Sequence, residues 1–308
     1  MSEREDKAVG NDARRRGGQR PARGGDSAAH AFRPRSLIVT VLGAFGRRLG
    51  GWVAVADLIE LMQELDISEQ AVRASVSRLK KRGFLTAERV DGQAGYRLTP
   101  QAEVILERGD RRIFRSSKPP AEGDWIIVVF SVPETERERR HVLRSRLSWL
   151  GFGNAAPGVW IAPPHLEDET REMIEAEGLS EYVALFRSRY VGLSGITEAA
   201  AHWWDLGALE QLYEAFIDAF TPVARRHNGM GHPPDAGAAF ADYVRMLTYW
   251  RVLPFLDPGL PPEILPRNWG GERATALFMR LHATLTGPAL QHVQQVGERR
   301  KRVSSDRP

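Results

Sequence analysis

The sequence predicts an α+β protein of several domains: an N-terminal winged helix-turn-helix, a central ferredoxin-like α+β domain and a C-terminal all-helical domain. Three observations predict this fold class. Helical apolar spacing followed by a hairpin pattern occupies residues 34–98, a strand-like apolar run begins at Trp125, and amphipathic helical spacing prevails beyond Trp203. A chain of 308 residues is long enough for two or three cores. We expect domains at 34–120, 121–198 and 199–297, with disordered basic tails at 1–33 and 298–308.

The first segment shows the element order of a winged helix. Ser68 is a suitable N-cap for a helix, and Gly83 follows that helix as a stop signal. Residues 91–95 are turn formers between two strand-like stretches, which is a hairpin signal. The expected order is helix 37–45, helix 55–62, helix 69–82, hairpin 84–98 and a helix from Thr99-Pro100.

The third helix of this segment has two faces. Val72, Val76 and Leu79 recur at the spacing of one inward face, while the opposite face is polar and basic. A helix with this division fits the major groove of DNA, where Gln70 and Arg73 at its N-terminal end can reach base edges. The basic residues at its far end and in the hairpin suit phosphates. The candidate DNA-binding residues are Gln70, Arg73, Ser77, Arg78, Lys80, Lys81, Arg89 and Arg97.

The charge distribution supports a polyanion as partner of the first segment. Residues 34–120 carry 15 Lys/Arg against 10 Asp/Glu, whereas residues 121–308 carry 20 against 24. The basic tails are also able to follow DNA phosphates, although a solubilising tail is the simpler interpretation.

Composition excludes several classes of protein. The chain contains no cysteine, so disulfides, thiolate metal sites and cysteine nucleophiles are excluded. No apolar run approaches the roughly 20 residues that cross a bilayer, and the polar N-terminus does not resemble a secretory signal. We therefore expect a cytoplasmic protein without membrane contact, and we expect no cofactor and no metal.

The middle segment alternates strands and helices. Residues 125–132 form an apolar, β-branched run typical of a buried strand, and Pro133 ends it. A helix at 134–150, a strand at 158–162, a helix at 165–177 and a strand at 182–191 follow. This β-α-β-α-β order predicts a ferredoxin-like layer of helices on one antiparallel sheet, serving as a scaffold and for dimerisation.

The C-terminal segment predicts helices at 203–220 and at 240–253. Residues 275–296 are either a third helix or a pair of helices broken near Gly287-Pro288. Its aromatic residues allow two interpretations, an apolar ligand pocket or an ordinary core. Both interpretations stay open from the sequence.

Three separated motifs resemble the PaaX family, repressors of phenylacetate-degradation operons. The match extends from about Arg33 to Val296. The motifs are Arg33–Ile38 with Gly50-Gly51-Trp52 and Glu69–Leu79, then Trp149–Gly153 with Pro157–Ile161, and finally Trp204-Asp205-Leu206 with Asp257–Pro266.

The resemblance implies a dimeric repressor that a CoA thioester such as phenylacetyl-CoA releases from its operator. The chain departs from the family pattern His-Glu-aromatic-Arg, because it reads Thr248-Tyr249-Trp250-Arg251. Tyr249, Trp250 and Arg251 are therefore the candidate ligand-binding residues, and the identity of the effector is open. Arg251 has two interpretations, a contact with a phosphate or carboxylate of the ligand and a structural salt bridge.

Two other function classes compete with a regulator. The middle segment also resembles the small ferredoxin-like nuclease of CRISPR adaptation, which needs an aspartate at the end of its first strand. Here the strand ends in Ser131-Val132-Pro133, and Asp124 lies at the opposite end, so we expect no enzyme.

His227 and His232 are expected in a loop without a carboxylate cluster. A winged-helix adaptor for protein contacts is the other alternative.

Overall fold

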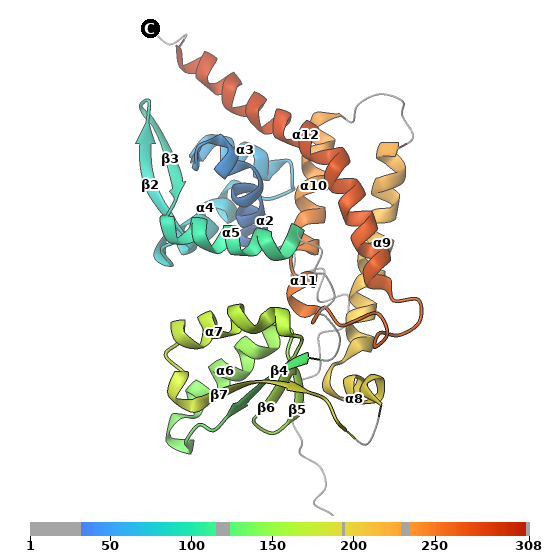
Figure 1. Ribbon diagram of the computed structural model, residues 1–308. Coiled ribbons are helices and arrows are strands. Elements are labelled where there is room, and N and C mark those ends of the chain that lie inside the picture. Colours follow the sequence, from blue (N-terminus) through green and yellow to red (C-terminus); the bar gives the residue numbers. More distant parts are fainter. Residues whose placement is uncertain (1–31, 115–123, 193–194, 229–234, 306–308) are drawn as a thin grey trace, which may run out of the picture.

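The computed structural model describes residues 32–114, 124–192, 195–228 and 235–305. The protein is a mixed α+β molecule in which two small sheets lie on one side of a helical C-terminal part (Figure 1). Most of the predicted N-terminal tail, residues 1–31, lies outside the described residues. Among the described helices, none combines the length and the apolarity that a bilayer span requires.

The first part consists of helices around a three-stranded antiparallel sheet of order β1-β3-β2. Asp91 and Gly92, both at positive φ, connect β2 to β3, which is the two-residue turn that Asp-Gly favours. The turn is shorter than the predicted 91–95, since Gln93 already pairs with Val90. The elements are α2 (Pro34–Val41), η1 (Leu42–Gly46), η2 (Arg47–Leu49), β1 (Trp52–Ala54), α3 (Val55–Gln63), α4 (Glu69–Lys81), β2 (Leu85–Val90), β3 (Gln93–Leu98) and α5 (Pro100–Phe114).

A tryptophan fixes how β1 lies against β3. The indole of Trp52 covers Gly95, and a Cβ at position 95 would overlap the ring atoms. The indole Nε1 donates a hydrogen bond to the carbonyl of Glu88 at 3.4 Å. Only glycine therefore allows the strand and the ring to approach this closely.

The central part has four antiparallel strands, where the sequence predicts three. The additional strand β5 pairs with β6 as a hairpin, because Gly158 at positive φ allows the turn between them. The sheet order β5-β6-β4-β7 follows from a β-α-β-β-α-β connection. The elements are β4 (Asp124–Phe130), η3 (Glu134–Glu136), α6 (Arg137–Trp149), β5 (Gly153–Ala156), β6 (Val159–Ala162), η4 (Pro164–Leu166), α7 (Glu167–Ala176), η5 (Ser180–Tyr182) and β7 (Val183–Arg189).

The C-terminal part is helical, as predicted. Its elements are α8 (Ile196–Trp203), α9 (Leu206–Asn228), α10 (Ala236–Trp250), α11 (Leu253–Leu256) and α12 (Gly270–Ser305). Of the two alternatives for residues 275–296, the single helix is present and the pair broken near Gly287-Pro288 is not, because α12 passes through Pro288 without interruption. Leu285 and Ala289 are fully buried on either side of the proline, so packing outweighs the lost hydrogen bond. The same helix includes residues 298–305, which the sequence predicts as part of a disordered tail.

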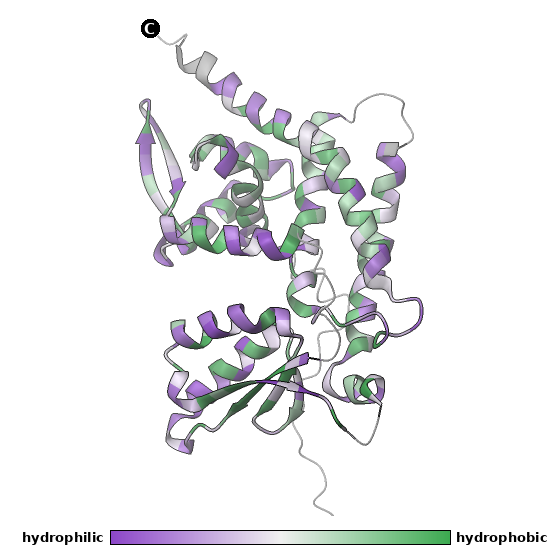
Figure 2. Cartoon of the chain, in the orientation of Figure 1, coloured by the Kyte–Doolittle hydropathy of each residue, from purple (hydrophilic) through white to green (hydrophobic). Residues whose placement is uncertain are grey.

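The first and last parts share one hydrophobic core. The ring of Phe45 lies 5.9 Å from that of Phe240 and 5.6 Å from that of Tyr243, measured between centroids. Thr248 donates a buried hydrogen bond of 2.8 Å to Thr40, which joins α10 to α2. Figure 2 shows hydrophobic residues where α10 and α12 face the first part, and hydrophilic ones toward the end of α12.

Candidate nucleic-acid interface and ligand cleft

One face of helix α4 is polar and exposed to solvent, and the opposite face is buried. Its N-cap is Ser68, whose side chain accepts a hydrogen bond from the Ala71 amide at 3.4 Å. The buried side consists of Val72, Ser75, Val76 and Leu79. All six predicted DNA-binding residues of this helix are exposed: Gln70, Arg73, Ser77, Arg78, Lys80 and Lys81.

Two of the arginines on α4 have partners within the helix. Arg73 forms an ion pair with Glu69, with its Nε 2.7 Å from Oε1, and half or more of each side chain is exposed. Such a pair contributes about 0.3–0.5 kcal/mol, so a base or phosphate displaces it at little cost. Arg78 donates to the Ser75 hydroxyl at 3.0 Å. Both guanidinium groups keep further N–H donors for a ligand.

The hairpin residues lie beside the C-terminal end of α4. The ammonium of Lys80 lies 6.0 Å from the centroid of the Tyr96 ring, which connects the helix to β3. Arg89 is exposed on β2. Arg97 forms an ion pair with Glu88 and donates to the carbonyl of Gly50 at 2.8 Å, so it also holds the hairpin to the chain before β1.

A cleft of about 660 Å³ lies where the three parts meet. Helix α5 forms one wall, η4 and α7 form the opposite wall, and α9 to α12 close the cleft. Its volume falls in the range of sites for small molecules. The lining residues are Arg108, Arg111, Arg112, Ile113, His165, Leu166, Asp168, Glu169, Glu172, Met173, Ala176, Tyr213, Trp250, Pro254, Asp257, Thr275 and Met279.

Arg112 connects all three parts through one guanidinium group. Its Nε donates to the carbonyl of Pro254 at 2.9 Å, and one terminal nitrogen donates to the carbonyl of Leu150 at 2.8 Å. The other terminal nitrogen binds Glu169 at 2.8 Å, and the group lies 4.9 Å from the Phe255 ring centroid. Burial lowers the pKa of Arg112, while Glu169 opposes that shift. The side chain therefore serves as a fixed cation in the cleft wall.

Tyr213 and Asp257 form a buried polar pair next to Arg112. The Tyr213 hydroxyl donates to Oδ2 of Asp257 at 2.5 Å, and the Gly259 amide donates to Oδ1 at 2.7 Å. Burial raises the pKa of Asp257, against the effect of these hydrogen bonds. Burial, and then the charge of Asp257, raise the pKa of Tyr213 well above its ordinary value. The pair holds the 257–259 turn against α9.

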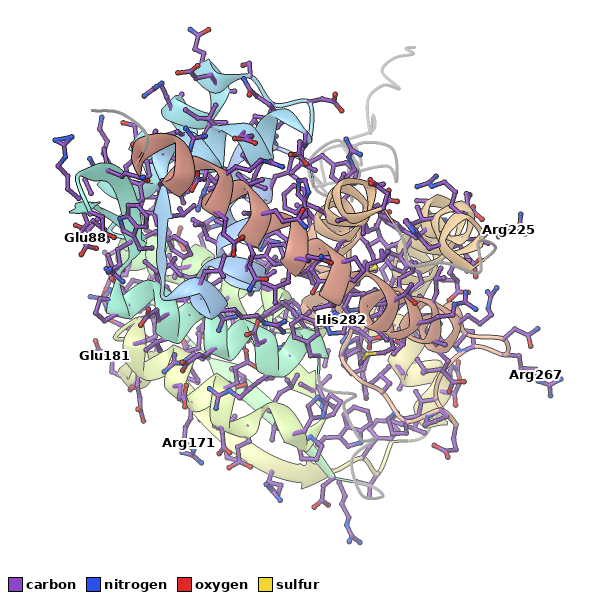
Figure 3. All side chains as sticks on the ribbon, turned by 90° about the horizontal axis from the view of Figure 1, so that it is seen from above. Glu88, Arg171, Glu181, Arg225, Arg267 and His282 are labelled. Atoms are coloured by element: carbon purple, nitrogen blue, oxygen red, sulfur yellow. The ribbon has the colours of Figure 1, made fainter. Side chains whose placement is uncertain are left out.

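The pKa values of two histidines near this site are lowered. Burial, with Arg112 second, lowers the pKa of His165 in the cleft. Burial, with Arg48 second, lowers the pKa of His282, which accepts or donates a hydrogen bond of 3.1 Å with the Tyr243 hydroxyl. Figure 3 shows His282 within the molecule, whereas Arg225 and Arg267 project from its rim.

Of the three predicted ligand-binding residues, one lines the cleft. Trp250 does so, with its ring stacked on Phe278 at 4.6 Å between centroids. The Tyr249 hydroxyl is buried without a hydrogen-bond partner among the described residues, and its ring packs against Phe216. The Nε of Arg251 is likewise buried and unpartnered there, and burial followed by the charge of Arg35 lowers the Arg251 pKa. The described residues contain no salt bridge of Arg251.

The motifs of the central and C-terminal parts pack against one another. Trp204 Nε1 donates to the carbonyl of Gly151 at 2.8 Å, and its indole covers Gly153 so closely that a Cβ there would overlap. Trp149 stacks on Phe255 at 5.3 Å. The motif residues therefore fix the orientation of the central sheet on the helical part.

Hydrogen bonds and ion pairs connect the far end of α12 to α3 and its C-cap Glu64. His292 Nε2 lies 2.7 Å from Oε2 of Glu64, and Arg299 binds Glu60 at 2.8 Å. Arg300 pairs with both Asp57 and Glu60. These carboxylates lie on one face of α3, the helix that precedes α4, so α12 contacts the support of the exposed helix directly.

The prediction of a loop around His227 is wrong, since His227 lies in α9. Its Nε2 is 2.7 Å from Oδ2 of Asp242, and Arg226 binds the same carboxylate at 2.8 Å. The tertiary contact with α10 extends α9 beyond the predicted end. His232 lies outside the described residues, among which no group of three or more His, Asp or Glu is placed to hold a metal ion.

The sequence does not identify Arg112, His165 or Asp257 as site residues, whereas Tyr213 is one of the C-terminal aromatic residues for which a ligand pocket is one of the two interpretations. Asp257 belongs to a motif already singled out, and Arg111-Arg112 follows the predicted helix that opens at Thr99. Those are the two signals that point toward the cleft. The pairing of Tyr213 with Asp257 depends on the tertiary fold and leaves no pattern along the chain.

The family resemblance is confirmed by comparison with known proteins. Residues 33–102 match the family PaaX-like protein, residues 118–200 the PaaX protein central Cas2-like domain, and residues 204–295 the PaaX-like protein C-terminal domain. The transcriptional repressor PaaX of Escherichia coli strain K12 is 24% identical over 266 residues, which are 85% of this chain and 84% of that protein. A solved structure of an uncharacterized protein from Mycobacterium tuberculosis has the same fold, with a TM-score of 0.55, 21% identity and coverage of 85% of this chain and 98% of that one. The chain belongs to the PaaX family.

Proposed function

We propose that this protein is a transcriptional repressor that binds operator DNA through a winged helix formed by residues 34–114, with α4 in the major groove. One observation carries the proposal: α4 has an exposed polar and basic face opposite its buried face, and it lies next to a hairpin that contains Arg89 and Arg97. The similar Escherichia coli protein is named a transcriptional repressor, which supports the same role.

In this proposal Gln70 and Arg73 read base edges, and Ser77 contacts a base or a phosphate. The other predicted residues, Arg78, Lys80, Lys81, Arg89 and Arg97, contact phosphates. A homodimer places two copies of α4 in successive major grooves, about 34 Å apart along an inverted repeat. The ferredoxin-like central part serves as scaffold and contributes to dimerisation, and the protein works in the cytoplasm without a cofactor.

An acyl-CoA such as phenylacetyl-CoA is the proposed effector. It binds the central and C-terminal parts and favours an arrangement that does not span both half-sites. A tenfold loss of operator affinity requires that the ligand prefer that arrangement by about 1.4 kcal/mol.

A titration of the protein with the DNA upstream of its own gene tests this function. It is run at one fixed salt concentration, with and without phenylacetyl-CoA, and with a random duplex of equal length as control. Nanomolar, sequence-specific binding that the thioester relieves supports both parts. Binding that ignores the thioester contradicts this effector and supports the DNA-binding part alone. Equal affinity for the random duplex contradicts sequence-specific binding and favours the adaptor alternative.

We also propose that the central part does not cleave nucleic acid. Asp124 is the first residue of β4 and lies 3.5 Å from Arg189, while the opposite end of the strand leads into Ser131-Val132-Pro133. Incubation with single- and double-stranded DNA and RNA in Mg²⁺ or Mn²⁺ should leave the substrates intact. Cleavage that EDTA abolishes contradicts this expectation.

A further inference from the structure

The cleft between α5 and α7 has one basic and one acidic wall. The basic wall comes from α5 and consists of Arg108, Arg111 and Arg112. The acidic wall comes from α7 and consists of Asp168, Glu169 and Glu172. In each set the spacing of three or four residues places side chains on the same helix face. The two walls belong to the first and the central part of the molecule, which have separate sheets. A ligand bound between the walls therefore affects the contact between these two parts.

Two ion pairs cross the cleft, and they differ in strength. Arg112 binds Glu169 at 2.8 Å with only 13% of the arginine side chain exposed, and two carbonyls also hold it. Arg108 lies 3.3 Å from Glu172, and more than half of each side chain is exposed. An exposed pair of this kind contributes at most about 1 kcal/mol. Arg108 is therefore available to a stronger anion, whereas Arg112 is not.

Arg111 is the cation of the basic wall that the fold leaves unused. It is exposed and lines the cleft, and among the described residues it makes no hydrogen bond or ion pair. A phosphate group prefers such arginines because their planar guanidinium groups bind two oxygens at once. Arg111 and Arg108 lie one helical turn apart, so a single anionic group is able to contact both.

Part of the cleft lining is apolar. It consists of Ile113, Met279 and Trp250, which line the cleft together with Tyr213. Methionine and aromatic side chains adapt to apolar groups of irregular shape. A ligand that carries both a negative charge and an apolar group therefore matches the arginines and the apolar side chains of the lining.

We propose that this cleft binds an amphipathic anion, with its phosphate on Arg108 and Arg111 and its apolar end against Trp250 and Met279, and that the ligand excludes the Arg108–Glu172 ion pair. The choice of an acyl-CoA as natural ligand rests on the proposed function. The position of the site and the replacement of Glu172 by the ligand at Arg108 do not rest on it. Binding thus removes the weaker of the two bridges between α5 and α7 and leaves the Arg112 bridge as the remaining tie.

Two single substitutions, which should change the ligand affinity in opposite directions, test whether the ligand replaces Glu172 at Arg108. The affinity of the full chain for phenylacetyl-CoA is measured by calorimetry, and the same variants are titrated with the fluorescent anion 8-anilinonaphthalene-1-sulfonate as a probe unrelated to CoA. Arg111→Ala should weaken the binding of both probes about tenfold. Glu172→Gln should tighten the binding of both by about threefold or more, because it removes the competing carboxylate. Arg171→Ala, on the same helix but paired with Glu167 outside the cleft, should leave both affinities unchanged.

The possible results distinguish a failure of the proposed cleft site from a failure of the proposed effector. If phenylacetyl-CoA binds and releases the operator but neither substitution changes its affinity, the cleft proposal is wrong and the proposed function stands. If phenylacetyl-CoA does not bind while both substitutions shift the sulfonate probe as expected, the cleft stands and this effector is wrong. If Glu172→Gln weakens binding of the sulfonate probe, the exchange is overturned, since a merely structural role of the ion pair predicts that sign. Circular dichroism and the melting temperature establish that each variant is folded.

Discussion

Arg112 donates a hydrogen bond of 2.8 Å to the carbonyl of Leu150, so a helix of the first part is attached directly to the last residue before the Gly151 turn of the central part. The same guanidinium donates to the carbonyl of Pro254 and binds Glu169, and only 13% of the arginine side chain is exposed. One side chain therefore makes polar contacts with all three parts.

Arg112→Ala should destabilise the protein by about 2–4 kcal/mol, because it leaves buried acceptors unsatisfied. Arg112→Lys should recover little of this loss, since an ammonium does not reproduce the fork of donors. Urea unfolding followed by circular dichroism measures both changes. The exposed Arg171→Ala serves as control and should change stability by less than about 0.5 kcal/mol. Equal stability of Arg112→Ala and wild type contradicts the role of Arg112 as the tie.

Gly95→Ala should cost about 2–3 kcal/mol, because the added methyl group overlaps the Trp52 ring. The combination of Gly95→Ala with Trp52→Ala should be less destabilised than the sum of the two single variants, since it removes the overlap. Thermal unfolding measures the effect. Gly195→Ala is the matched control because nothing lies within 4 Å of the added Cβ. Additive losses would show that the indole does not restrict position 95.

Arg73→Ala should reduce operator affinity by about 1–3 kcal/mol and relax the sequence preference, if Arg73 reads a base. The loss of its pair with Glu69 is too weak to explain a change of that size. Lys81→Ala should weaken binding to all sequences alike and reduce the salt slope by about one unit. Binding titrations of operator and random DNA at several salt concentrations separate the two. Unchanged operator binding by Arg73→Ala removes it from the base-reading set.

The protein should lose stability as the pH falls below about 6.5, the ordinary pKa of an imidazole. Burial, with Arg112 second, lowers the pKa of His165, and burial, with Arg48 second, lowers that of His282. A lowered pKa in the folded state means that the unfolded chain binds more protons there. The stability from these neutral imidazoles is therefore complete above pH 6.5 and is lost as the pH falls through the folded-state pKa. Urea unfolding at pH 7.5 and 5.5 should show a smaller loss for the half-buried His282→Gln than for wild type. An equal loss contradicts this assignment.

The elements that local patterns determine were predictable. The N-cap Ser68, the alternating faces of α4 and the Asp-Gly turn each depend on neighbours in the chain, and the structure contains all three. The apolar run of β4 likewise identifies a buried strand without knowledge of its partners.

The features that distant contacts determine were not predictable. Strand β5 lies in the stretch between the predicted helix 134–150 and the predicted strand 158–162, and its only described partner strand is β6. Helix α12 passes Pro288 because α9 and α10 bury its flanks, which no local propensity indicates. The cleft combines residues 108 and 279 of the chain, so its walls are visible only after folding.

The continuous helix α12 also has a mechanical consequence. Its 36 residues, at 1.5 Å each, make a rod of about 54 Å whose base packs on α9 and whose far end is ion-paired to α3. For a rod of that length, a tilt of one degree at the base displaces the tip by about 1 Å. A few degrees of tilt thus move the far end by about the length of a hydrogen bond. A small tilt of α12 at its base would in this way be amplified at α3, the helix that precedes α4.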